Sequence, residues 1–111
     1  MQKILRSSIK LVIVLLITVL SLQAQAVVIT STVTGGQWYN STTWVGGTIP
    51  GAGDDVIIVN GSAVSIGIDA ECLSLTINTG NQSSSVTITA GADLTVHGDI
   101  TINRTTLDGA F

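Results

Sequence analysis

Apolar and polar residues alternate along the chain from Val56 to Ile102. Val, Ile and Leu recur at every second position, and mostly Thr and Ser stand between them. A period of two is typical of β-strands with one buried face. The apolar positions form six groups: Val56/Ile58, Val64/Ile66/Ile68, Leu73/Leu75/Ile77, Val86/Ile88, Leu94/Val96 and Ile100/Ile102. Glycine-containing turns separate the groups and no helical period follows Leu22, so the chain is predicted to be all-β.

The spacing of the strands favours one of two all-β folds. The interval from Ile58 to Ile77 equals the interval from Ile77 to Val96, and each of the three residues closes a similar string: "VII", "LTI" and "LTV". A fixed period of about 20 residues is typical of a solenoid, in which each coil stacks on the one before. The alternative is a β-sandwich, which also has short strands with turns every 8–12 residues or so. The constant interval favours the solenoid over the sandwich.

The segment before these strands, residues 27–54, has a different composition. It starts with a β-like run and continues as a Gly-rich loop that holds three of the four aromatic residues, Trp38, Tyr39 and Trp44. One interpretation makes these rings a sugar-stacking face. The other makes Trp44 a plug over the N-terminal end of the core, and we favour it for Trp44 because large aromatic side chains bury so much area. For Trp38 and Tyr39 the two interpretations stay equal.

Residues 1–26 have the pattern of a cleaved secretory signal peptide. Basic residues at positions 3, 6 and 10 precede the apolar run Leu11–Leu22, and the small residues of "AQA" end at Ala26. The apolar run is shorter than the roughly 20 residues of a membrane-spanning helix. We therefore expect cleavage after Ala26 and a secreted or cell-surface protein, in contact with the membrane only through the signal peptide before cleavage.

Charge and cysteine content restrict the partners and the source of stability. After cleavage, Arg104 is the one Lys or Arg against seven Asp and Glu residues. Nucleic acids and anionic membrane surfaces are poor partners, because both need clustered basic residues, and we expect no nucleic-acid partner. The chain is long enough for one small domain. Its single cysteine excludes the internal disulfides that small exported domains often use. Stability should come from further chain, an oligomer or a bound ion.

A longer motif supports the solenoid. The string "TW-x-GG-x-x-P-x-x-GDDVII-x-x-G", from Thr43 to Gly61, is followed by "V-x-I" and "L-x-L-x-I". From about Gly36 to Ile102 the chain resembles the start of the eight-glycine domain family and related right-handed parallel β-helices. These occur at the N-terminus of large exported surface proteins, many from Bacteroidetes-type bacteria. The resemblance implies a right-handed parallel β-helix, a surface or extracellular location, and a role in binding glycans or in holding larger assemblies.

We therefore expect three parts: a signal peptide (1–26), an N-terminal strand with an aromatic capping loop (27–54) and β-helix rungs (55–111) that are truncated. The expected function is that of the N-terminal segment of an exported surface protein in adhesion, scaffolding or glycan interaction. Its partners would be glycans or other surface proteins, with no cofactor. Two alternatives stay open: a small carbohydrate-binding module, or the start of a β-helical polysaccharide lyase or hydrolase whose catalytic rungs lie beyond Phe111.

Four acidic residues are candidates for chemistry, and we assign none of them a catalytic role. Asp54 and Asp55 follow a Pro-Gly turn and are weak candidates for Ca²⁺, which takes six to eight oxygen ligands. Turn formation, in which an Asp side chain accepts a backbone hydrogen bond, is the favoured interpretation. Asp69 and Glu71 could face this pair from a neighbouring rung as a glycosidase-like acid couple, but no spacing in the sequence requires it.

Cys72, His97 and four Asn residues complete the candidates. Alternation with Leu73 predicts that Cys72 lies on the polar face or at a turn, free for an intermolecular disulfide. Alternation with Val96 places His97 outward, beside Asp99, and His97 is the sole partner that a catalytic cysteine would have. The Asn residues of N-x-S/T sequences are interpreted as turn residues for a bacterial source and as glycan acceptors for a eukaryotic one: Asn40, Asn60, Asn81 and Asn103.

Overall fold

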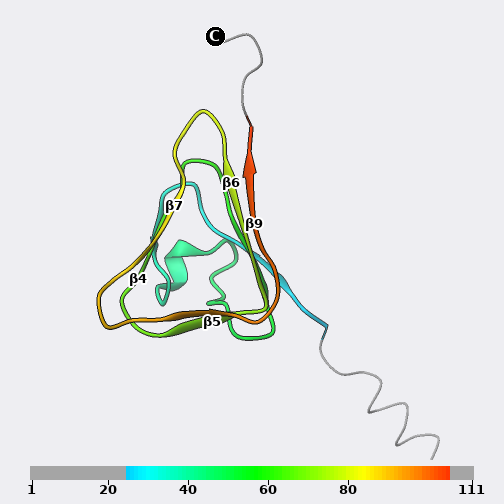
Figure 1. Cartoon of the computed structure of the whole chain (residues 1–111), viewed down its shortest axis with the longest axis vertical. Helices are drawn as coiled ribbons and strands as arrows, with labels where there is room; N and C mark the ends of the chain where they lie inside the picture. Colours follow the sequence, from blue (N-terminus) through cyan, green and yellow to red (C-terminus); the bar gives the residue numbers. More distant parts are fainter. Residues whose placement is uncertain (1–24, 106–111) are drawn as a thin grey trace, which may run out of the picture.

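The chain forms a parallel β-solenoid of about three turns in a computed structural model that describes residues 25–105. Viewed along the stack, the coils have a triangular outline with one sheet on each side (Figure 1). Every pair of neighbouring strands is parallel. The predicted parallel solenoid is confirmed, and the described residues do not form the alternative β-sandwich.

The nine strands are short and belong to three sheets. The four-stranded sheet has the order β1 (Val28–Thr30), β3 (Asp55–Ile58), β6 (Ser74–Thr79), β9 (Ile100–Arg104). The three-stranded sheet has the order β2 (Gly35–Gln37), β4 (Ala63–Ile66), β7 (Ser85–Ile88), and the two-stranded sheet pairs β5 (Ala70–Cys72) with β8 (Leu94–Val96). A single 3₁₀ turn, η1 (Ser41–Thr43), lies in the loop after β2.

The constant repeat predicted from Ile58, Ile77 and Val96 holds for one coil and fails for the next. Ile58 lies in register beside Ile77, as expected. Ile77, however, pairs with Ile102 and not with Val96, which lies beside Cys72 in the two-stranded sheet. The reason is corner length: the corners after β3, β4 and β5 have four, three and one residues, whereas those after β6, β7 and β8 have five, five and three. The second of the two equal intervals therefore joins two different sheets.

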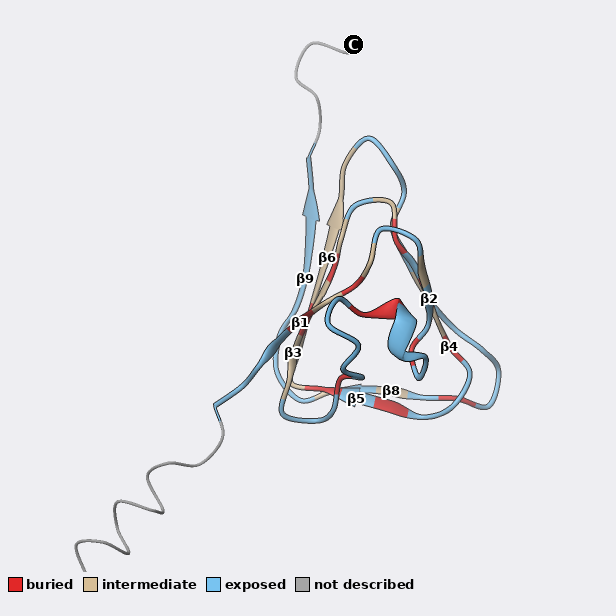
Figure 2. Cartoon of the chain, turned by 180° about the vertical axis from the view of Figure 1, so that it is seen from behind, coloured by how far each residue is buried: buried red, intermediate tan, exposed pale blue. Residues whose placement is uncertain are grey.

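Stacking buries the inward side chains, and burial ends at the last rung. Ile29, Val56, Leu75 and Ile100 pair in register along one inward row of the four-stranded sheet. Their exposed fractions are 4%, 0%, 3% and 61%. Figure 2 shows the same gradient, with β9 exposed along its whole length. A rung of this kind is buried only where neighbours cover both of its sides.

The N-terminal end of the solenoid is closed by the loop that holds the two tryptophans. Trp38 and Trp44 are buried, with their rings edge to face, 5.0 Å apart and inclined by 77°. The Trp44 Nε1–H donates to the backbone oxygen of Trp38 at 2.7 Å. Backbone bonds from Val45 to Thr30 (2.9 Å) and from Thr32 to Thr43 (2.8 Å) hold the loop on β1. In Figure 1 this loop and η1 lie inside the triangular outline, over the end of the coil.

Two side chains face opposite to the prediction, and both lie next to a corner. Ile68, expected inward, is 69% exposed, whereas Cys72, expected on the polar face, is completely buried. Residues 67–69 form the bend between β4 and β5, and Ile68 turns outward there. Cys72 keeps the phase of Ile66, and the one-residue corner at Leu73 shifts the phase of the inward residues in β6. In β5 the inward residues are Ala70 and Cys72, and Glu71 points out. A corner resets the phase of a strand, which the period-two pattern alone does not show.

The predicted signal peptide falls almost entirely on residues 1–24, outside the described residues. Ala26, the predicted cleavage position, is described and exposed, but its exposure does not test cleavage. Among residues 25–105, no helix is long and apolar enough to cross a membrane.

Candidate functional site

The aromatic residues do not form the stacking face that was one interpretation of the sequence. Trp38 and Trp44 have exposed fractions of 1% and 2%, so their ring faces pack inside the cap instead of meeting solvent. Tyr39 is the exposed member, at 46%, and its hydroxyl donates to the backbone oxygen of Asp69. The physical reason is the area of the two indoles, which close the end of the core. Trp44 is thus a plug, and so is Trp38.

Asp54 and Asp55 are engaged in hydrogen bonds within the fold. The Asp54 carboxylate accepts from the Gly51 amide at 2.8 Å, which closes the turn before β3. This is a turn contact of the expected kind, although the donor comes before the Asp in the chain instead of after it. Asp55 accepts from the Ser74 hydroxyl at 2.6 Å, across one rung. Within residues 25–105, no group of three or more His, Cys, Asp or Glu side chains could hold a metal ion.

The outer face of the two-stranded sheet brings together residues of two rungs. The Glu71 carboxylate lies 4.0 Å from His97 Nε2, and both side chains are about half exposed. The Asp69 carboxylate accepts from the Asp93 amide at 2.9 Å. The carboxylate contacts of Asp69 and Glu71 are therefore with the following rung, not with Asp54 or Asp55 as an acid couple would require. His97 points outward as expected, toward Glu71.

Cys72 is an enclosed thiol and not an accessible one. Burial, together with the charge of Asp55, raises the pKa of Cys72 to about 11 from its ordinary 9.0. The His97 backbone amide donates to the Cys72 carbonyl at 3.0 Å, but the imidazole lies on the outer face and the thiol on the inner one. Cys72 and His97 therefore do not form a pair of nucleophile and base. An intermolecular disulfide is disfavoured too, because it needs an accessible sulfur.

Most of the Asn residues in N-x-S/T sequences form side-chain hydrogen bonds within the fold. Asn40 caps η1 and accepts from the Thr42 amide at 3.1 Å. The Asn103 amide donates to the Asn78 side chain of the previous rung at 3.1 Å. Asn103 lies in β9, so it is a strand residue rather than the turn residue that the sequence suggested.

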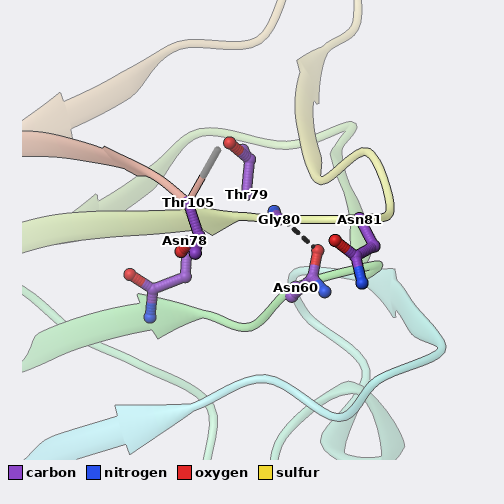
Figure 3. Close-up of a pocket in the computed structure, with 6 residues that line it drawn as sticks. All are labelled: Asn60, Asn78, Thr79, Gly80, Asn81 and Thr105. Carbon is purple, nitrogen blue, oxygen red and sulfur yellow. Dashed lines mark hydrogen bonds between the residues drawn. The ribbon is translucent and has the colours of Figure 1, made fainter. Parts of the chain in front are cut away.

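Asn60 and Asn81 line a hollow at one corner of the triangle (Figure 3). Its volume is about 240 Å³, and its lining consists of Asn60, Asn78, Thr79, Gly80, Asn81 and Thr105. A second hollow of about 290 Å³ adjoins it, between residues 79–84 and the end of β9 with Arg104. Sequence reasoning missed this place, because its residues come from three different coils. The recurring Asn-containing turns were the one signal that could have indicated it.

Comparisons of the chain with protein-family models, with curated proteins and with solved structures find no match.

Proposed function

We propose that this chain is the capped N-terminal segment of an exported surface β-solenoid and that it serves adhesion or scaffolding. The observation that supports the proposal most is the difference between the two ends of the stack. The N-terminal end is closed by Trp38 and Trp44, whereas the apolar row of the last described rung is exposed. The cap closes the first coil, and a further rung would stack on the last described one.

The energetics of stacking support this role of the last rung. Ile88, Ile100 and Ile102 are 47%, 61% and 61% exposed, and each continues an inward row of the rung before. Fully burying one aliphatic side chain contributes about 1.5–3 kcal/mol. Among residues 25–105, β9 pairs with β6 alone, so its other edge offers backbone N–H and C=O groups to another strand. A further rung would satisfy both at once, as each coil does for the one before it.

Export, surface location and membership of the eight-glycine family belong to the same proposal. The predicted signal peptide and the excess of acidic residues support export without nucleic-acid binding. A sugar-stacking face of Trp38 and Trp44 is not proposed, since both rings are buried. Catalysis is not proposed for the described residues, because Asp54, Asp55 and Asp69 are engaged in hydrogen bonds that shape the coils.

The test combines mass with hydrogen exchange on the native product. Intact mass in the secreted and surface fractions should place the N-terminus at Val27. The β9 amides should exchange slowly in the native product and quickly in residues 27–111 produced alone, since only the former has a covered last rung. A native product that keeps residues 1–26 would contradict export. Fast exchange of β9 in the native product would contradict the scaffold role of the last rung.

A further inference from the structure

The two adjoining hollows at the corner after β6 are lined mostly by neutral polar residues and by one arginine. They share Thr79, Gly80, Asn81 and Thr105, and the second also includes Arg104. We propose that they form one binding site for an acidic saccharide, a sugar chain that carries carboxylates, and that Arg104 recognises the charge. This inference goes beyond the proposed function and does not depend on it.

The charge distribution points to an anionic ligand. Arg104 is the only Lys or Arg between residues 25 and 105, and no Asp or Glu lines either hollow. Among the described residues the ion pair found is that of His97 and Glu71, on another sheet. The Arg104 guanidinium presents a planar fork of donors that matches a carboxylate in a bidentate arrangement.

The neutral groups around Arg104 favour a sugar over a simple anion. Asn81, Gln82 and Ser83 are exposed on the loop between β6 and β7. Their amides and hydroxyls both donate and accept hydrogen bonds, as the hydroxyls of a sugar require. A phosphate site would gather several cations or a row of backbone N–H groups. Here one cation stands among amides and hydroxyls, which suits a sugar carboxylate with its neighbouring hydroxyl groups.

The loop that carries these groups is held in place before any ligand arrives. The Asn60 side-chain oxygen accepts from the amides of Gly80 (2.9 Å) and Gln82 (3.3 Å), and Figure 3 shows the first of these bonds. The Gly61 amide donates to the Ser84 hydroxyl at 2.9 Å. Contacts between successive corners thus fix the loop, and a preformed site loses less entropy on binding.

The test is a titration of the isotopically labelled exported chain, followed through its backbone-amide NMR shifts. The probe is an oligogalacturonate, and its methyl ester is the matched neutral control. We expect the acidic form to shift residues 79–84 and 102–105, and the ester to bind at least about tenfold more weakly. Arg104→Gln should weaken binding of the acidic form by at least about tenfold. Arg104→Lys, which keeps the charge but loses the planar fork, should fall between.

Four results would overturn the inference. Equal affinity for acid and ester, or an Arg104→Gln variant that binds like the parent, would remove the role of Arg104. Shifts that appear away from the corner, or no shifts at all, would remove the site. Unchanged spectra for β3 and β4 in the Arg104 variants are the control for folding. A negative titration leaves the mass and exchange tests of the proposed function untouched, because those report on export and on β9.

Discussion

The two ends of the solenoid contain the same kinds of residue in the same register, and yet they differ completely in burial. At the N-terminal end, Ile58 is fully buried beneath the tryptophan cap. Ile102 belongs to the same inward row, with Ile77 between them, and is 61% exposed. Both positions hold isoleucine in the same inward row of the same sheet. What differs is the presence of a neighbour on the outer side of the rung.

This difference teaches that a coil of a solenoid has no interior of its own. Its inward face becomes a core only through the coils or caps on either side. At the N-terminal end the neighbour is an irregular loop, whose two indoles replace a whole rung. At the last described rung, the middle coil covers one side only. The four predictions that follow test this contrast, from the largest expected effect to the smallest.

Trp44→Ala should lower the free energy of unfolding by about 3–5 kcal/mol, because it removes a large buried ring and leaves a cavity under the cap. It also removes the donor to the Trp38 carbonyl. Urea denaturation followed by circular dichroism measures the change. Tyr39→Ala is the matched control at a half-exposed aromatic position and should cost about 1 kcal/mol or less. Similar losses in the two variants would mean that the tryptophans do not close the core.

Ile58→Ala should cost about 2–5 kcal/mol, whereas Ile102→Ala should cost less than about 1 kcal/mol. The two positions share residue type, sheet and row, so the pair isolates the effect of burial. Urea midpoints of the two variants give the comparison directly. A large loss for Ile102→Ala would show that the last described rung is covered in solution, and the contrast between the ends would not apply there.

Gly35→Ala should destabilise the closed end more than Gly46→Ala does. Both glycines have positive φ, +73° and +86°, a backbone conformation that L side chains rarely adopt, so both variants should lose about 1 kcal/mol to strain. At Gly35 a Cβ would also overlap the backbone of Ala63, whereas at Gly46 it would meet open space. The excess loss for Gly35→Ala, measured by thermal denaturation, reports how closely β2 approaches β4. Equal thermal shifts would argue against this close approach.

The Cys72 thiol should make stability depend on pH in the alkaline range. Its pKa is about 11 in the fold and 9.0 ordinarily, so the folded state binds the proton more tightly. The contribution is fully present below pH 9 and is lost as pH rises from 9 to 11, by about 1 kcal/mol per pH unit. Comparing urea midpoints of the parent and Cys72→Ala isolates the thiol. A parallel pH dependence in the two proteins would contradict the burial of Cys72 beneath Val96.

Much of this architecture could be predicted from the chain, because its strands carry a strong local signal. The inward positions Val56, Ile58, Val64 and Ile66 follow from alternation, and all are buried. The plug role of Trp44 follows from its size and its place before the first long strand. The corner hollow could not be predicted, since Asn60, Asn81 and Arg104 become neighbours only when three coils are stacked.

The sequence by itself determined the all-β class and the first repeat, because strand period and turn residues are local properties. It favoured the stacked solenoid over a β-sandwich without deciding between them. Only the tertiary structure decided which way a residue beside a corner faces, as at Ile68 and Cys72. It also decided that Val96 pairs with Cys72 and Ile102 with Ile77. The physical reason is that corners of different length reset the phase of each strand, and this phase is fixed by the rung beneath. Burial, likewise, belongs to the stack and not to the single strand.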